Sequence, residues 1–416
     1  MTKGRLLLAA VLTGLLVATA GGTASAGGTM GAKRVCTTGE FRCFALAATV
    51  DGQLLRAANP PAGSLTPANY HTAYNLPTQA PSGSVTVAIV DAFDDNTILA
   101  DLNTYSQKYG LPAMQNCSTS ITTSCFKKVN LGAPVGSAVT PGWDVEIALD
   151  VETVHAICQN CKIVLVEAKD NQFASLAAAV DRAATEAGIV SNSYGSYGFD
   201  GSNGKTFDKH WNKPNHAIVV SAGDDGYGAA YPAGLNTTIS VGGTRLTLNA
   251  SGGYGSERAW GPDATHAWGT GSGCMNGSVS GAPAIAAKAF QKSVANYAKT
   301  GCGTTRGLND VAANADPNTG SAVFTTSHQW LKVGGTSLAA PLIAGVFALK
   351  NDFAGAQYPA SLLYSHVGAA SFRDVKTGTD DAHKYPIACS KTPACNAVTG
   401  YDLPTGVGTP NGIGGF

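Results

Sequence analysis

The chain alternates short apolar runs with longer segments that have helical spacing. The runs are rich in Ile and Val, which is typical of buried strands, and they cover residues 84–93, 162–168, 189–195 and 217–226. The segments with helical spacing cover residues 96–110, 144–157 and 173–188. This alternation predicts an α/β fold in which a parallel sheet is flanked by helices. Functional sites of such folds lie beyond the carboxyl ends of strands, and glycine-rich turns are expected there at residues 191–198 and 221–228.

The composition narrows the class of protein. A chain of 416 residues suffices for one large domain or two medium ones. Only 13% of the residues are charged and the formal net charge is +0, so we expect no nucleic-acid partner and no attraction to an anionic membrane. The 51 glycines suit a compact, loop-rich globule.

The N-terminus has the pattern of a secretory signal peptide. Lys3 and Arg5 precede a short apolar run, which ends in the small residues Ala24-Ser25-Ala26. The alternative is a membrane anchor, but the run is shorter than the ~20 residues that a membrane span needs. We therefore expect a signal peptide at 1–26, a short pro-segment or N-terminal extension of uncertain order at 27–64, and one catalytic domain at 65–416. The mature protein should be secreted, extracellular and monomeric.

The ten cysteines fall mostly in close sequential pairs. In an exported protein this pattern predicts local disulfides that staple loops, with Cys36–Cys43, Cys117–Cys125, Cys158–Cys161 and Cys389–Cys395 as the natural pairs; Cys274 and Cys302 remain, and the exact connectivity stays open. The pair in "CQNC" also has the spacing of a redox or zinc motif. Because no second such pair lies nearby and the compartment is oxidising, a structural disulfide is the favoured interpretation.

A candidate nucleophile stands in "KVGGTSLAAPLIAG" (332–345). Ser337 follows two glycines and begins a helical pattern, so its hydroxyl is held at a turn. A serine hydroxyl needs a base, and a Ser-His-Asp triad with Asp91 is the first possibility. None of the eight histidines lies in a glycine-rich segment suited to that role, and His155 is mid-helix, where a satisfied or surface histidine is favoured.

The helical segment 144–157 offers a different base. Glu146 and Asp150 are four residues apart, so both carboxyls project from one helix face. Two like charges at this spacing repel, which raises a pKa and lets the pair share a proton. A solvated acidic face is the alternative, but the apolar residues around them argue against a broadly polar surface. In the turn at 221–228, Asp224 can donate a hydrogen bond to an oxyanion if it is protonated, or it can simply hold the turn; Asp225 is its rival.

Together these segments resemble the sedolisin family of serine-carboxyl peptidases, which have a subtilisin-like fold. "GGTSLAAPLIAG" is similar to the family's nucleophile segment, "GWDVEIALDVE" to its Glu-x-x-x-Asp helix and "SAGDDGYG" to its oxyanion turn. The segments "YPAGLNTTISVGGT" and "GLNDVAANADPNTG" resemble those that line the family's cleft, and the similarity runs from about residue 65 to the end.

The resemblance implies a Ser-Glu-Asp endopeptidase that acts on peptides or proteins at acidic pH. Ser337 would be the nucleophile, Glu146 the general base, Asp150 the residue that orients it, and Asp224 the oxyanion donor. Two alternatives stay open: a Ser-His-Asp subtilase that uses Asp91, and a catalytically silent secreted binding protein. One departure from the family is that residues 27–64 are too few for its usual folded propeptide.

The resemblance also implies one structural Ca²⁺. Its ligands would be the side chains of Asp374 and Asp402 and the carbonyls of Val375, Val398 and Gly400, which are the hard oxygen ligands that Ca²⁺ prefers. The chain departs from the family by an insertion, "CSKTPACNA", and by Val398, which stands where a glycine is usual. Val398 is therefore the least secure of the expected ligands.

Overall fold

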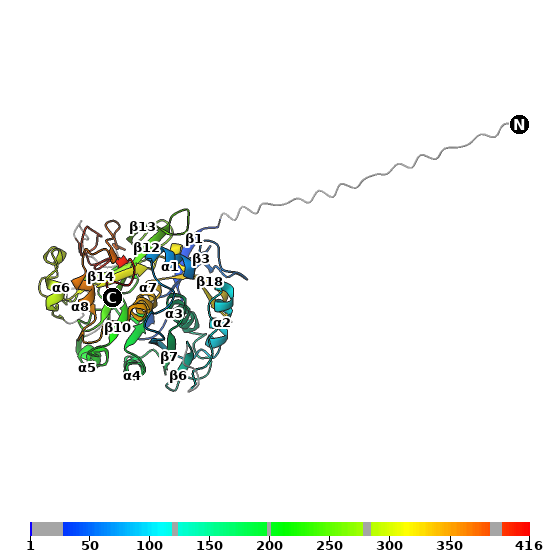
Figure 1. Ribbon diagram of the computed structural model, residues 1–416, viewed down its shortest axis with the longest axis horizontal. Coiled ribbons are helices and arrows are strands. Elements are labelled where there is room, and N and C mark those ends of the chain that lie inside the picture. Colours follow the sequence, from blue (N-terminus) through cyan, green and yellow to red (C-terminus); the bar gives the residue numbers. More distant parts are fainter. Residues whose placement is uncertain (2–27, 119–123, 198–200, 278–283, 383–392) are drawn as a thin grey trace.

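The computed structural model describes Met1 and residues 28–118, 124–197, 201–277, 284–382 and 393–416 (Figure 1). Apart from Met1, the predicted signal peptide at 1–26 lies outside the described residues. Within the described ranges, no helix combines the length and the apolar character that a membrane span requires.

An eight-stranded sheet forms the centre of the molecule. The strands follow the order β13-β12-β10-β8-β5-β7-β6, and β16 also pairs with β12. Every pairing is parallel except that of β12 with β13. The strands are β5 (Thr86–Ala92), β6 (Phe126–Asn130), β7 (Lys162–Ala168), β8 (Ile189–Asn192), β10 (Ala217–Ser221), β12 (Ile239–Leu248), β13 (Tyr254–Ala259) and β16 (Val311–Asn314). The four strands predicted from apolar runs are therefore confirmed as β5, β7, β8 and β10.

Helices flank this sheet, as predicted. They are α1 (Pro67–Tyr74), α2 (Ile98–Tyr109), α3 (Trp143–Ile157), α4 (Phe173–Ala184), α5 (Gly201–Trp211), α6 (Ala289–Lys292), α7 (Thr336–Lys350) and α8 (Ala360–Ser365). Helix α3 packs against α7, and both contact the sheet (Figure 1). All residues of α3 are buried, and so are those of α7 except Lys350, because both helices are apolar around most of their circumference.

A second sheet joins the N-terminal segment to the strand that precedes α7. Its order is β1-β3-β18-β17, and β4 pairs with β3. These strands are β1 (Met30–Arg34), β3 (Leu46–Val50), β4 (Gln53–Leu54), β17 (Ser321–Thr325) and β18 (Gln329–Gly334). The sequence left the order of residues 27–64 open; the structure builds most of this segment into the body of the molecule.

Smaller sheets complete the fold. One pairs β2 (Arg42–Cys43) with β9 (Tyr194–Gly195), and another pairs β19 (Phe372–Arg373) with β20 (Thr409–Pro410). In the third, β14 (Gly269–Cys274) lies between β11 (Asp225–Tyr227) and β15 (Gly307–Leu308). Three of the predicted disulfides are confirmed: Cys36–Cys43, Cys117–Cys125 and Cys158–Cys161. The two cysteines that the sequence left over, Cys274 and Cys302, also form a disulfide. Cys395 is also disulfide-bonded, but its predicted partner Cys389 lies outside the described residues.

Candidate active site

Ser337 lies in the first turn of α7, directly after the turn at Gly335 that follows β18. Gly335 caps the helix with φ +94°, and a Cβ at this position would lie 1.9 Å from the Phe44 carbonyl oxygen and 3.0 Å from Oδ2 of Asp224. Only glycine fits such a turn. Ser337 is buried at the second position of α7; its Oγ donates to the Ser193 carbonyl at 3.0 Å and accepts from the Phe44 N–H at 3.0 Å.

Pro341 leaves the backbone carbonyl of Ser337 without its usual hydrogen bond within the helix. The residue at this position of α7 would ordinarily donate its N–H to the Ser337 carbonyl, but proline has none. The Ser193 hydroxyl lies 3.4 Å from that carbonyl and also donates to Oδ1 of Asp150 at 2.8 Å. Ser193 therefore links the nucleophile's helix to the carboxyls of α3. Sequence reasoning noted its glycine-rich turn but did not single out this serine.

Three buried carboxyls lie together beside Ser337. Glu146 and Asp150 project from α3, and Asp91 comes from β5; each is 0% exposed. Both oxygens of Glu146, both of Asp91 and Oδ2 of Asp150 accept no hydrogen bond from the described residues. A solvated acidic helix face is therefore excluded. A buried carboxylate without a donor is costly, so this cluster must retain protons.

The pKa values of the cluster agree with this conclusion. Burial raises the pKa of Glu146 well above its usual value, the carboxylates of Asp150 and Asp91 raise it further, and the hydroxyl of Ser337 acts in the opposite direction. Burial likewise raises the pKa of Asp150, against the effect of the Ser193 hydroxyl. Burial also raises the pKa of Asp91, and the negative charge of Asp150 raises it further. These groups titrate together and share protons.

Asp224 and Asp225 have separate roles. Oδ1 of Asp224 accepts hydrogen bonds from the Thr336 N–H at 2.8 Å and from its hydroxyl at 3.0 Å, so this carboxyl is tied to the start of α7. Asp225 forms an ion pair with Arg34 at 2.6 Å instead. Burial raises the pKa of Asp224 to about 7, although the charge of Arg34 and the Thr336 hydrogen bonds lower it. Of these two carboxyls, Asp224 is therefore the one that is tied to the start of the nucleophile's helix.

The described histidines do not supply a base for Ser337. His155, in α3, binds the Pro112 carbonyl through Nε2 at 2.8 Å, and burial lowers its pKa to about 4. It is thus a satisfied buried histidine, as the sequence favoured. The other described histidines bind elsewhere, and no hydrogen bond joins any described histidine to Ser337 or Asp91. His383 lies outside the described residues.

The buried carboxyls make stability depend on pH. Glu146, Asp150 and Asp91 keep protons in the folded state above about pH 4, where the unfolded chain releases them. Their contribution to the free energy of unfolding is complete below about pH 4 and is lost as pH rises through the raised pKa values. The pKa of Asp94 is lowered to about 2, so it has the opposite effect, but only below about pH 4.

We therefore expect the Ser337→Ala protein, which cannot digest itself, to melt at a higher temperature at about pH 5 than at about pH 8, by several degrees. Differential scanning calorimetry checks this. Replacing Glu146 and Asp150 by their amides should flatten the dependence, and an equal or higher melting temperature at about pH 8 in the parent would contradict the buried protonated cluster.

The structure brings the two halves of the expected calcium site together. The Gly400 N–H donates to both carboxylate oxygens of Asp374, at 3.1 and 3.0 Å, and the Val398 N–H donates to Oδ2 of Asp402 at 2.8 Å. Burial raises the pKa of Asp402 well above its usual value, and the nearby charge of Asp374 adds to this effect. Val375 is buried beside Asp374. Val398 is not among the residues with positive φ, so a β-branched residue fits its backbone.

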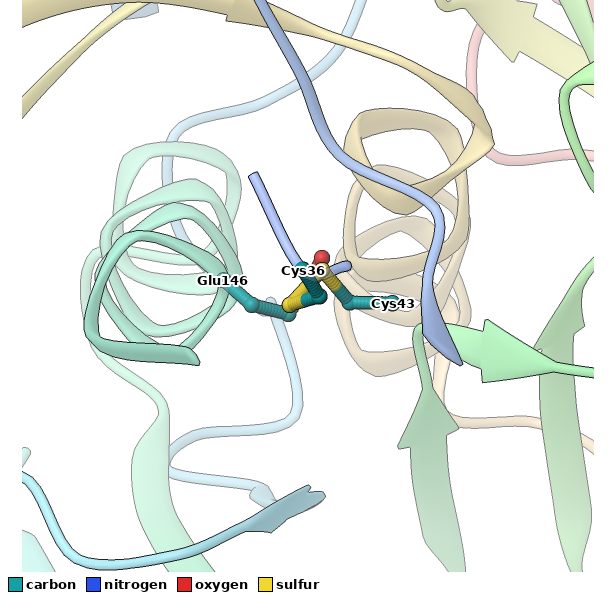
Figure 2. Close-up of side chains that lie close together, drawn as sticks. All are labelled: Cys36, Cys43 and Glu146. Carbon is teal, nitrogen blue, oxygen red and sulfur yellow. A yellow bond between two sulfur atoms is a disulfide. The ribbon is translucent and has the colours of Figure 1, made fainter. Parts of the chain in front are cut away.

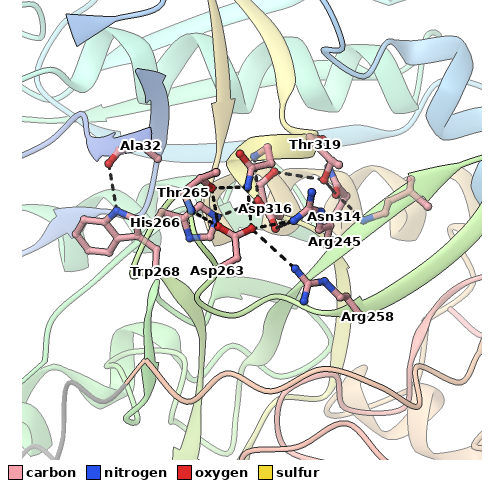
Figure 3. A network of polar contacts seen from close by, with 12 residues as sticks. Ala32, Arg245, Arg258, Asp263, Thr265, His266, Trp268, Asn314, Asp316 and Thr319 are labelled. Carbon is pink, nitrogen blue, oxygen red and sulfur yellow. Dashed lines mark hydrogen bonds and ion pairs between the residues drawn. The ribbon is translucent and has the colours of Figure 1, made fainter. Parts of the chain in front are cut away.

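Two other clusters of possible ligands occur in the described ranges, and neither suits a metal. In the first, the two sulfurs beside Glu146 belong to the Cys36–Cys43 disulfide (Figure 2). The second joins Asp263, His266 and Asp316 (Figure 3). There the guanidinium of Arg245 lies 2.9 Å from Asp263 and 3.7 Å from Asp316, so the cluster already holds a cation.

Comparisons with known proteins agree with this fold. A model of the Subtilase family matches residues 132–366, more than half of the chain. Kumamolisin from Bacillus sp. (strain MN-32) is 29% identical over 373 residues, which are 84% of this chain and 62% of that protein. Sedolisin from Pseudomonas sp. (strain 101) is 30% identical over 213 residues, 46% of this chain and 32% of that protein. The chain thus spans less than two thirds of either relative.

A solved structure supports the same assignment at the level of the fold. Pseudomonas sedolisin, a serine-carboxyl proteinase complexed with two molecules of pseudo-iodotyrostatin, superimposes with a TM-score of 0.65 and 22% identity. The match covers 85% of this chain and 96% of that one. On these comparisons, the chain belongs to the subtilase family and, within it, to the sedolisins.

Proposed function

We propose that the protein is a secreted serine-carboxyl endopeptidase that hydrolyses peptide bonds at acidic pH. The observation that carries this proposal is the packing of α3 against α7, which sets the buried carboxyls of Glu146 and Asp150 beside the buried hydroxyl of Ser337. A buried, coupled carboxyl cluster beside a serine, with no described histidine bonded to it, is what a carboxyl-activated nucleophile requires.

In the proposed reaction Ser337 Oγ attacks the peptide carbonyl while Glu146 takes the hydroxyl proton, in the form of the cluster in which the shared protons lie on Asp150 and Asp91. Collapse of the tetrahedral intermediate breaks the C–N bond, and Glu146 returns the proton to the leaving amine. Water then hydrolyses the acyl-enzyme by the same exchange of a proton with Glu146. Asp150, held by the Ser193 hydroxyl, orients Glu146.

The oxyanion needs donors in a site that excludes water. The Ser337 N–H supplies one, and the protonated carboxyl of Asp224 supplies the other. Because the pKa of Asp224 is about 7, this donor is present below neutral pH and is lost as pH rises. The proposed acidic optimum follows from this loss. The runner-up, a Ser-His-Asp triad with Asp91, has no described histidine bonded to either of its partners.

The function is tested with protein purified from culture medium, after its N-terminus has been sequenced. A peptide-library digest at about pH 4, near ordinary carboxyl pKa values, should show cleavage that the Ser337→Ala protein lacks. Equal cleavage by both proteins would assign the activity to a contaminant. Turnover that is greatest above about pH 8 would contradict a carboxyl mechanism.

We also propose a structural Ca²⁺ held by the side chains of Asp374 and Asp402 and the carbonyls of Val375, Val398 and Gly400. The contacts between these two loops, and the mutual repulsion of two carboxyls that accept hydrogen bonds mainly from backbone N–H groups, support a cation there. The exposed ammonium of Lys376 lies 3.8 Å from Asp374, and no ion pair joins it to Asp402 among the described residues. The ion would tie the loop at 398–402, which follows the insertion, to the segment after β19, and it would take no part in the reaction.

Chelation should therefore lower stability. Adding a Ca²⁺ chelator to the Ser337→Ala protein should lower its melting temperature by several degrees, and excess Ca²⁺ but not Mg²⁺ should restore it. Asp402→Asn should melt lower in Ca²⁺ and respond less to the chelator. A parent protein whose melting temperature ignores both chelator and Ca²⁺ would contradict the site.

A further inference from the structure

The segment "GLNDVAANADPNTG" holds a buried amide that the proposed mechanism does not use. Asn309 lies between β15 and β16 and is 0% exposed. Its Nδ2 donates to the carbonyls of Gly271 at 2.9 Å, Leu403 at 3.0 Å and Pro404 at 3.2 Å. Its Oδ1 accepts from the Ser240 hydroxyl at 2.7 Å. Both polar atoms of the side chain are therefore engaged, and one amide joins three segments that are distant in the sequence.

The surroundings of this amide require a donor without charge. Three carbonyl oxygens face Nδ2 of Asn309, so they would repel a carboxylate, and an apolar side chain would take these hydrogen bonds away. A Cβ at Gly242, in β12, would lie 2.5 Å from that Nδ2 and 2.3 Å from the Pro404 carbonyl oxygen. The amide is thus tightly packed between the central sheet and the loop at 402–406.

Gly271 connects the amide to the turn that carries Asp224. The Gly271 N–H donates to the Gly223 carbonyl at 2.6 Å, so β14 is bonded directly to this turn. The hydroxyl of Thr270 also reaches the Gly271 carbonyl, at 3.2 Å, but it belongs to β14 itself. The hydrogen bond from Asn309 is therefore the one that ties Gly271 to the loop on its other side.

The same turn leads directly to the nucleophile. The Gly223 N–H donates to the Thr336 hydroxyl at 2.9 Å. That hydroxyl and the Thr336 N–H both donate to Oδ1 of Asp224. Thr336 precedes Ser337 at the start of α7. A continuous series of contacts therefore runs from the buried amide through β14 and this turn to the helix that carries the nucleophile.

We propose that Asn309 is a positioning residue of the active site: it fixes β14 against the loop at 402–406, and β14 holds the turn from which Asp224 serves the oxyanion. This inference rests on the proposed function. It adds that a buried side chain outside the reacting groups sets the rate of the chemical step. Such an effect needs little movement, because a misplacement of about 1 Å far from the chemistry can cost about 10²-fold in rate.

The titration of Asp224 reports on the position of the turn. Burial is the largest cause of its raised pKa, while Arg34, from β1, lowers this pKa and Asp225, in the same turn, raises it. Glu146, on α3, also faces this carboxyl, whose charge raises the pKa of Glu146. A turn that loosens admits water and weakens the effect of burial, so the pKa of Asp224 should fall. The alkaline limb of kcat should then move to lower pH.

The test compares two substitutions at this position, in protein purified from culture medium. Asn309→Ala should lower kcat for a fluorogenic peptide by about tenfold to a hundredfold with KM nearly unchanged, and should move the alkaline limb down by about one pH unit. Asn309→Asp should keep more of kcat at about pH 4, because a buried, protonated carboxyl still donates to the Gly271 carbonyl. This advantage over Asn309→Ala should disappear as pH rises and the carboxyl ionises.

Tyr364→Phe is the matched control. The buried hydroxyl of Tyr364 donates to Oδ1 of Asp310, the residue next to Asn309, at 2.7 Å. Its removal also costs a buried hydrogen bond, but this bond does not lead to β14 or to the turn. Tyr364→Phe should therefore keep the kcat and the alkaline limb of the parent. Circular dichroism and a melting curve must show that each protein is folded at the assay temperature.

A measurement without turnover separates this inference from the proposed function. In the Ser337→Ala background, hydrogen–deuterium exchange followed by mass spectrometry reports how often the turn opens. Asn309→Ala should speed exchange in peptides that cover residues 221–228 by about tenfold, and Tyr364→Phe should leave it at the parent rate. If Asn309→Ala does not fold, Asn309→Asp replaces it, and its exchange should exceed that of the parent at about pH 7 but not at about pH 4.

Each outcome decides one of the two claims. Faster exchange in the turn with the kcat and the alkaline limb of the parent overturns the positioning role of Asn309 but leaves the peptidase. A fall in kcat without faster exchange in the turn, or an equal fall in Tyr364→Phe, also overturns that role. Faster exchange in the turn with no turnover in any protein, the parent included, overturns the peptidase and leaves Asn309 as the residue that fixes the turn.

Discussion

Glu146→Gln should lower kcat/KM of the protein by about 10²–10⁴-fold, the usual contribution of a general base. The amide keeps the size and shape of the side chain but cannot accept the Ser337 proton. The substitution also removes one titrating group from the buried cluster. We expect the fold to tolerate this loss, because both oxygens of Glu146 accept no hydrogen bond from the described residues. The loss should appear in kcat rather than in KM, since the serine is deprotonated only on the way to the transition state.

Glu152→Gln is the matched control for this change. Glu152 is a buried carboxyl on the same helix, and it accepts a hydrogen bond from the Phe324 N–H at 3.1 Å, away from Ser337. Its amide retains an oxygen for that bond, so activity should stay close to that of the parent. Fluorogenic peptide turnover at about pH 4, with folding checked by circular dichroism, distinguishes the two variants. Near-normal turnover in Glu146→Gln would point to another base.

Asp224 should set the alkaline limit of activity. Asp224→Ala should cost about 10²–10³-fold in kcat, the usual effect of removing one oxyanion donor. The pKa of Asp224 is about 7, so its carboxyl donates below neutral pH and, once ionised, repels the developing oxyanion above it. Activity should therefore fall as pH rises through about 7.

Asp224→Asn separates the charge of this residue from its position. The amide donates at every pH, so the alkaline limb near pH 7 should move upward or disappear while some activity is kept. The pH dependence of kcat for the three proteins is the measurement. An alkaline limb that is unchanged in Asp224→Asn would show that another group sets it.

The sequence predicted the features that are encoded locally. The strands β5, β7, β8 and β10 and the helices α3 and α7 follow from apolar spacing, which does not depend on distant partners. The spacing of Glu146 and Asp150 placed two carboxyls on one face, and the resemblance, not the spacing, assigned them roles. The turn chemistry of Gly335 likewise singled out Ser337.

The unpredicted part depends on long-range contacts. Phe44 meets Ser337 across 293 positions of sequence, and no local pattern encodes that meeting. Residues 27–64 carry apolar residues without helical or strand signals strong enough to show where they dock. Ser193 was missed for the same reason, since its link to Asp150 is visible only when β8 and α3 are brought together.

The central claim is that a carboxyl, rather than an imidazole, activates the serine. Its most direct test is the rate at which a fluorophosphonate labels Ser337 at about pH 5, near carboxyl pKa values, with the site mapped by mass spectrometry. We expect labelling at Ser337 that Glu152→Gln preserves and Glu146→Gln nearly abolishes. Labelling of Ser337 at the parent rate in the Glu146→Gln protein would contradict the account.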